Sequence, residues 1–151
     1  MKNPFITTVA LLLVLEANSQ ISVHPEMEKR AREFHRVIGK QDEAGWKKFI
    51  LENYTQALID KPLKTKIVRP DGKEASAGSS EATNQIDSKV AMYAQLHKDF
   101  GNSKIISIAP EGDQLTMVLQ NSSGLNGSFA FTFEKKQAYL IDGLKVEARG
   151  R

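Results

Sequence analysis

Cysteine is absent from the 151 residues of this chain. The fold therefore contains no disulfide, and no lipid can be attached to a cysteine behind a signal sequence. A chain of this size does not need such links, because it can bury roughly two thirds of its unfolded surface in one hydrophobic core. We expect a single domain that is held together by packing.

Residues that hold metals or attack substrates are also scarce. The three histidines, His24, His35 and His97, are far apart in the sequence and form no His-x-x-x-His pair. No Gly-x-Ser-x-Gly motif is present, and Ser79-Ser80 has no histidine near it in the sequence. The sequence therefore predicts no metal, no cofactor and no nucleophilic hydrolase.

Charge of one sign does not accumulate either. Lysine and arginine total 21 against 18 aspartate and glutamate residues, which leaves a formal net charge of +3. The basic residues, including Lys47-Lys48 and Lys135-Lys136, are dispersed among acidic ones. No aromatic residues alternate with them, as a base-stacking surface requires. Nucleic acid is not an expected partner.

A long apolar run occurs only at the start of the chain. Met1-Lys2-Asn3 carries one positive charge and precedes a mainly apolar stretch over residues 4–15. This stretch is shorter than the about 20 residues of a membrane span but is typical of a secretory signal peptide. Small residues in Ala17-Asn18-Ser19 predict cleavage before Gln20. We expect a secreted or periplasmic protein of residues 20–151 without a membrane anchor. The alternatives are a retained anchor or a buried N-terminal strand.

Two helices are predicted at the start of the mature chain. Between Pro25 and Gly39, apolar residues recur every three or four positions, which indicates an amphipathic helix: Met27, Ala31, Phe34 and Ile38. Asp42 can cap a second helix, which we expect to run to Pro62. Its apolar stripe comprises Trp46, Phe49, Ile50, Tyr54, Ala57 and Leu58. The short turn between the two helices folds them back on each other.

Residues 61–83 differ in character from the helices around them. Residues 64–69 could form a short strand, and Pro70-Asp71-Gly72-Lys73 has turn chemistry. Residues 74–83 are mostly Ala, Ser and Gly, so the insertion at 61–83 is interpreted as a flexible loop or flap. A third helix is predicted from about Asn84 to Phe100, with Gly101 as its end.

After this helix the apolar period changes from helical to two. Four strands in a meander are predicted around Ile106–Ile108, Leu115–Leu119, Phe129–Phe133 and Tyr139–Val146, with turns between them. Gly143 interrupts the alternation as a β-bulge would. One face of the sheet must be covered, and the helices are available to cover it. The predicted class is α+β.

Several stretches are similar to a known superfamily. The order of two helices, a third helix and a curved meander resembles the cone-shaped nuclear transport factor 2-like superfamily, which includes ketosteroid isomerases and SnoaL-type polyketide cyclases. Residues 34–42, 46–54, 96–101 and 141–147 resemble the version that precedes exported serine hydrolases and peptidases. The similarity covers most of 26–60 and 84–147.

The resemblance implies a fold and a range of functions. It implies three N-terminal helices packed on a curved antiparallel sheet of at least four strands, with a concave pocket between them, and often a homodimer through the sheet. The chain departs from this version in two ways, because it carries the 61–83 insertion and no hydrolase follows it in the sequence. Functions within the superfamily range from catalysis to binding, so the fold does not settle the activity.

Candidate site residues follow from this implied pocket. The side chains expected to line a ligand cavity are Trp46, Phe49, Tyr54, Tyr93, His97, Phe129 and Phe131. The candidates for acid-base catalysis are His97, Asp99 and Tyr93, with Asp142 and Tyr54 as further residues of suitable type. The same regular spacing more often indicates core residues, and the favoured alternative for His97 is a core or rim histidine that is hydrogen-bonded to the backbone.

Three functions remain open from the sequence. The first is an exported, non-catalytic domain that binds a small apolar molecule or a partner protein. The second is an isomerase- or cyclase-type enzyme with acid-base residues inside the cone. The third is a stand-alone docking module for a serine hydrolase or peptidase. The enzyme requires a buried group with a shifted pKa. The binding domain requires an apolar cavity, and the docking module requires an exposed apolar patch.

Overall fold

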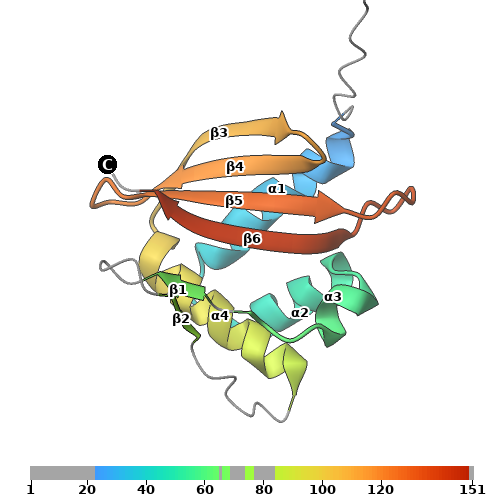
Figure 1. Cartoon of the computed structure of the whole chain (residues 1–151), viewed down its shortest axis with the longest axis horizontal. Helices are drawn as coiled ribbons and strands as arrows, with labels where there is room; N and C mark the ends of the chain where they lie inside the picture. The colour runs from blue at the N-terminus through green and yellow to red at the C-terminus, as the bar shows by residue number, and fades with distance from the viewer. Residues whose placement is uncertain (1–22, 65, 69–73, 77–83, 150–151) are drawn as a thin grey trace, which may run out of the picture.

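The computed structural model describes residues 23–64, 66–68, 74–76 and 84–149, and this part of the chain has an α+β fold (Figure 1). It contains four helices, a sheet of four antiparallel strands and a separate two-stranded hairpin. The expected signal peptide and its cleavage site fall in residues 1–22, outside the described ranges. None of the helices in these ranges has the length and apolar character that crossing a membrane requires.

Helices α1 (Pro25–Ile38) and α2 (Glu43–Asn53) form a tight antiparallel pair, as the sequence predicts. Asp42 caps α2, because its carboxylate accepts a backbone N–H of the first turn at 3.0 Å. The Trp46 indole N–H is shared between two carbonyl oxygens at the end of α1, each at 3.0 Å: those of Val37 and Lys40. Val37 lies in the last turn of α1 and Lys40 in the turn that follows, so these bonds attach the Trp46 ring of α2 to the connection between the helices.

The expectation that the second helix continues to Pro62 is wrong. Helix α2 ends at Asn53, and the short helix α3 (Gln56–Asp60) follows. Between them, Tyr54 is extended and forms a parallel bridge to Ile141 of the last strand. Thr55 then caps α3 by accepting a backbone N–H at 3.2 Å. The described chain therefore has four helices instead of the three expected, because pairing with the sheet outweighs helix propensity at Tyr54.

The segment after α3 contains more regular structure than expected. Strands β1 (Lys66–Val68) and β2 (Glu74–Ser76) pair antiparallel, so the expectation of a loop over residues 74–76 is wrong. The predicted turn at 70–73 and the remainder of the predicted flap at 77–83 lie outside the described residues. Helix α4 (Gln85–Phe100) confirms the predicted third helix, and Asn84 caps it by accepting a backbone N–H at 3.0 Å.

The four-stranded meander is confirmed. Its spatial order follows the chain, β3 (Lys104–Glu111), β4 (Gln114–Gln120), β5 (Asn126–Phe133) and β6 (Ile141–Arg149). Gly112 has a φ of 61° in the turn between β3 and β4, which suits a residue without a side chain. The register shifts between Thr132 and Phe133, with Asp142 as the extra residue on β6, so the break predicted at Gly143 is a bulge.

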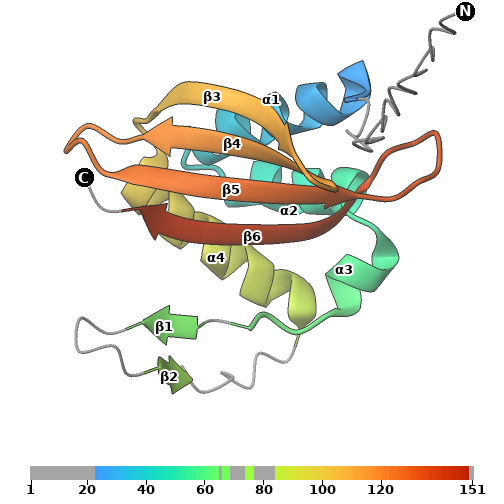
Figure 2. The ribbon, with the colours of Figure 1, turned by 45° about the horizontal axis from the view of Figure 1, so that its top comes forward.

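The helices cover one face of the sheet, and the hydrophobic core lies between the two layers (Figure 2). Cross-strand neighbours point to the same face, so Met117 of β4 and its partner Phe129 of β5 both face the helices. Phe34 of α1 meets them there, and all three are fully buried. Ala109, Thr116 and Ala130 form a row across the opposite face of the sheet.

Candidate functional site

The aromatic residues expected to line a ligand pocket come together, and they fill the space between the helices and the sheet. The Phe34 ring centroid lies 5.5 Å from that of Tyr93, 5.6 Å from Phe129 and 5.3 Å from Phe131. Rings at these separations are in direct contact. Three further expected pocket residues are 2–3% exposed and pack around the same cluster: Trp46, Phe49 and Tyr54.

Two phenols form a hydrogen bond inside this core. The hydroxyl oxygens of Tyr54 and Tyr93 lie 2.9 Å apart, and both side chains are buried. Burial raises the pKa of Tyr54 well above its ordinary value, and the hydrogen bond from Tyr93 offsets part of this. Burial also raises the pKa of Tyr93, with further contributions from the charge on Tyr54 and from their hydrogen bond. Both phenols are therefore neutral at physiological pH.

The three catalytic candidates on α4 lie in different surroundings. Tyr93 is in the core, whereas the half-buried His97 contacts α1, with its Nδ1 atom 2.8 Å from the carbonyl oxygen of Ile38. Because a carbonyl only accepts, Nδ1 carries the proton and holds the ends of the two helices together. Asp99 is exposed and accepts from the Gln95 amide at 3.0 Å. The structure does not bring Asp99 together with Tyr93.

Asp142, the fifth residue of catalytic type, also has a structural partner. Its carboxylate accepts the hydroxyl of Thr55 at 2.7 Å, and the Thr55 backbone N–H donates to Ile141 at 2.9 Å. These bonds hold the bulge of β6 to the start of α3. Within the ranges that the structure describes, no group of three metal-ligating side chains is close enough to hold an ion.

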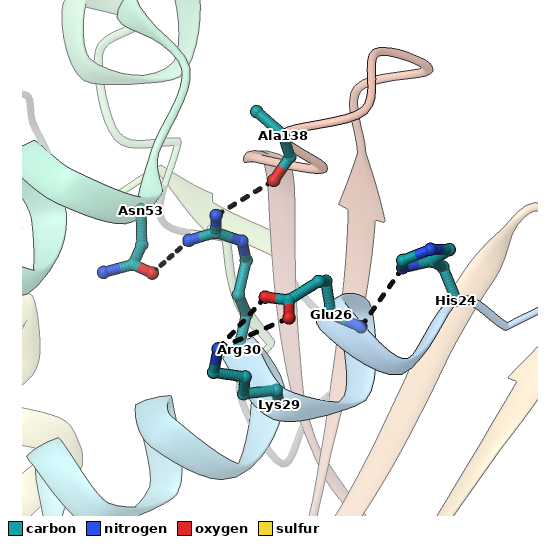
Figure 3. A network of polar contacts seen from close by, with 6 residues as sticks. All are labelled: His24, Glu26, Lys29, Arg30, Asn53 and Ala138. Carbon is teal, nitrogen blue, oxygen red and sulfur yellow. Dashed lines mark hydrogen bonds and ion pairs between the residues drawn. The ribbon is translucent and has the colours of Figure 1, made fainter.

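One surface groove runs between α1 and α2, with a volume of about 530 Å³. Most of its side chains are charged, with both signs represented: Glu26, Lys29, Arg30, Glu33, Arg36, Lys40, Asp42, Lys48 and Glu52. Figure 3 shows the Arg30 guanidinium between Asn53 of α2 and the carbonyl of Ala138, to which it donates at 2.9 Å. Arg30 thus joins α1, α2 and the loop before β6, which is a structural role.

A second hollow lies along β6 and is lined by residues of the segment 58–64, of α4 and of the strands β4, β5 and β6. Its volume is about 470 Å³, and we call it the β6 hollow. Apolar side chains make up much of its lining: Leu58, Pro62, Leu63, Met92, Leu96, Ala130, Leu144 and Val146. Its remaining lining residues are Lys61, Lys64, Lys89, Gln114, Thr132, Gly143 and Lys145.

Lys89 is the unusual member of this lining. Its side chain is only 1% exposed, and it is the sole charged residue among the buried side chains of the described ranges. Its ammonium donates to the backbone carbonyls of Ile59 and Lys61, both at 2.8 Å. Burial lowers the pKa of Lys89, and the nearby charge of Asp60 partly opposes this.

Sequence reasoning missed Lys89, although a signal for it exists. Lys89 lies one helical turn before Tyr93 and three residues after Ile86, so it occupies the apolar stripe predicted for α4. A lysine on such a stripe either extends its methylene stem so that the ammonium reaches water, or buries the ammonium next to hydrogen-bond acceptors. The backbone carbonyls at the C-terminal end of α3 are those partners. The sequence did not predict that the helix breaks after α2, so it did not predict these carbonyls either.

Comparisons with family models, with curated proteins and with solved structures found no match for this chain. An α+β fold alone is compatible with many activities. The features of this chain that bear on its function are therefore the β6 hollow and the hydrogen bonds of the catalytic candidates His97, Asp99 and Tyr93.

Proposed function

We propose that the chain is an exported, non-catalytic binding domain whose β6 hollow takes a small apolar ligand. The hollow itself carries this proposal, because it combines a volume of about 470 Å³ with a largely apolar lining. Pockets for small molecules have volumes of roughly 300–1,000 Å³ and mostly hydrophobic walls with a few polar groups. The β6 hollow meets both conditions.

The bonds of the expected catalytic residues support a non-catalytic function. The His97 ring is hydrogen-bonded to the carbonyl of Ile38, and the Tyr93 hydroxyl is hydrogen-bonded to that of Tyr54. Asp99 lies at the surface. An acid-base enzyme of the isomerase or cyclase type requires a carboxylate or histidine in a buried site with a suitable pKa. In the described chain, the buried polar side chains are those of Lys89, Thr116 and Ser128, so no carboxylate is among them.

The architecture proposed for this domain is the cone of the nuclear transport factor 2-like superfamily. Three features support it: the paired helices α1 and α2, the antiparallel meander, and the parallel bridge that joins the chain after α2 to β6. In this arrangement the closely packed aromatic core occupies the place where the resemblance implies a pocket. Binding would therefore occur at the edge of the cone.

Export can be tested together with ligand retention. The full chain is produced in an exporting host, purified gently from the exported fraction and measured by native mass spectrometry. We expect the mass of residues 20–151, accompanied by a stoichiometric small molecule or by an empty site that can be filled. A mass that still includes residues 1–19 would contradict cleavage before Gln20. The same spectrum shows whether the protein forms the homodimer that we propose on the basis of the resemblance.

Binding in the β6 hollow can be tested with the neutral fluorophore phenylnaphthylamine. Ala130 lines the hollow on the sheet face opposite the core, so Ala130→Phe should fill the hollow and weaken binding by about tenfold or more. Ala109→Phe is the matched control, because Ala109 lies in the same row of the same face and does not line the hollow. Absence of saturable binding, or equal effects of the two variants, would refute the proposal.

One observation favours the alternative of a stand-alone docking module for a serine hydrolase or peptidase. Apart from the bridge at Ile141, no described strand pairs with the outer edge of β6, and Val146 near this edge is 37% exposed. A free edge can pair with a strand of another protein. A spectrum without any retained molecule, combined with no saturable dye binding, would favour this alternative.

A further inference from the structure

We propose that the ligand of the β6 hollow is an amphiphile with an acid group, such as a free long-chain carboxylate, and that the acid group pairs with the Lys89 ammonium. This inference rests on the proposed function and adds the chemical class of the ligand. It follows from the hydrogen bonds of Lys89, from the charges around the hollow and from its apolar walls.

The Lys89 ammonium is incompletely neutralised in the protein alone. An ammonium has three N–H donors, and two of them go to the carbonyl oxygens of Ile59 and Lys61. Carbonyls solvate the charge but do not cancel it, and a buried charge is costly unless it is paired. No carboxylate of the described residues forms a hydrogen bond with Lys89, and Asp60 acts on it only through its nearby charge. An incoming anion could therefore supply the missing counter-charge.

The charges around the hollow also favour an anion. Its charged lining residues are all lysines, Lys61, Lys64, Lys89 and Lys145. Of these, Lys145 is paired with Glu147 at 2.6 Å. Asp60 adjoins the hollow, is exposed, and accepts from Gln56 at 2.8 Å. The local excess of positive charge attracts acids and disfavours amines.

The apolar walls define the remainder of the ligand. Leu58 of α3, Met92 of α4 and Leu144 of β6 come from three different elements and leave no further polar group that a sugar or nucleotide could use at those positions. A hydrocarbon tail fits such a surface. Each methylene that becomes buried should strengthen binding by about fourfold, which is the fold-change that corresponds to the usual hydrophobic gain per methylene.

The test compares two probes that differ only in their head group. Dodecanoate and dodecanol are titrated below their aggregation limits against the full exported protein, with displacement of phenylnaphthylamine as the readout. We expect dodecanoate to bind about tenfold or more tightly than dodecanol, because its carboxylate forms an ion pair with the Lys89 ammonium and the neutral alcohol does not. Lys89→Met should remove this preference, because neither head group can then pair with a charge at this position. Lys64→Met, a control at the exposed rim, should keep the preference.

The outcomes separate this inference from the proposed function. Equal binding of both probes by the wild-type protein would overturn the role of Lys89 while the hollow remains a binding site. Loss of the preference in Lys64→Met but not in Lys89→Met would place the acid at the rim and overturn it as well. If neither probe displaces the dye, and the dye itself does not bind, the proposed function fails together with this inference.

A pH series on the wild-type protein tests the pairing even if Lys89→Met does not fold. The preference for dodecanoate should fall to half at a pH below 10.5, the ordinary lysine pKa, because the pKa of Lys89 is lowered. The other charged groups that face the hollow are Asp60, Lys61, Lys64 and Lys145. A preference that falls to half only at about pH 10.5 would show pairing with an exposed rim lysine and overturn the assignment.

Discussion

The buried pair of tyrosines offers the sharpest test of whether the aromatic cluster is a core or a ligand site. The hydroxyls of Tyr54 and Tyr93 bond only to each other at 2.9 Å, in surroundings where neither can reach water. Replacing one tyrosine with phenylalanine leaves the other hydroxyl buried without a partner. Replacing both removes the polar atoms together and retains the shape of the rings.

The expected magnitudes follow from this difference. An unsatisfied buried hydroxyl costs about 1–3 kcal/mol, so Tyr54→Phe and Tyr93→Phe should each lower the unfolding free energy by about that amount. The double variant removes both partners, which can be nearly neutral, so its loss should not exceed that of one single variant. The interaction energy of the cycle should then be at least about 1 kcal/mol, whereas independent sites add within about 0.5 kcal/mol.

Urea denaturation gives these energies directly. Trp46 is the only tryptophan of the chain and is 2% exposed, so its emission reports on loss of the core, and circular dichroism provides a second probe. The affinity for phenylnaphthylamine should be the same in all four proteins, because neither tyrosine lines the β6 hollow. Additive losses, or weaker dye binding without loss of stability, would refute the description of the pair as a structural feature of the core.

Three further outcomes are expected. Removing the imidazole with His97→Ala should cost about 1–2 kcal/mol through the lost bond to Ile38, whereas Asp99→Asn at the surface should change stability by less than about 0.5 kcal/mol, both by urea denaturation. Gly127→Ala should lower the melting temperature, because its Cβ would lie 2.5 Å from the Phe100 ring; an unchanged melting temperature would contradict the close packing there. Above about pH 10 the unfolding free energy of the wild-type protein should fall with pH by roughly 1.4 kcal/mol per unit for each core phenol, because the unfolded phenols lose protons that the folded ones keep. The double-phenylalanine variant lacks this contribution, so equal slopes in the two proteins would contradict the raised pKa values.

The elements that the sequence predicts well are those with a strong apolar period and clear end signals. Helix α4 has Asn84 at its start and Gly101 at its end, and the structure places its bounds within one residue of the prediction. Alternation in the meander predicts the order of its strands and the bulge beside Gly143. These features are local, because each depends on residues that are close in the sequence. The expected alternation of Ile106 and Ile108 is wrong, because a register shift between Ile105 and Ser107 leaves Ile106 52% exposed.

The elements that the sequence does not predict depend on distant partners. The break at Tyr54 occurs because this residue pairs with Ile141, which lies far along the chain and has no signature near α2. Strand β2 consists of Glu74, Ala75 and Ser76, which have low strand propensity, so its pairing with β1 and not its composition defines it. No local pattern contains this information.

The spacing of the aromatic residues predicts part of the candidate site, but not whether it contains a cavity. The spacing of the aromatic residues predicts that they are buried on one side of each element, and they are. Whether buried rings enclose a cavity or contact one another depends on how their volumes fill the interior, and periodicity does not report on that. Phe34 of α1 decides this question, because its ring contacts Tyr93 in the helical layer as well as Phe129 and Phe131 of the sheet.

This packing explains why we place binding at the edge of the sheet. A ligand at the centre of the core would have to displace Phe34, and losing a buried phenylalanine from a core costs about 3–5 kcal/mol. At the edge, residues of the segment 58–64 line the β6 hollow together with residues of α4 and β6. Helix α4 thus has two functions on neighbouring turns, because Tyr93 completes the core while Lys89 directs its charge toward the hollow and the end of α3. The one charged side chain buried in the described chain therefore lines the hollow that we propose as the binding site, outside the aromatic cluster around Phe34.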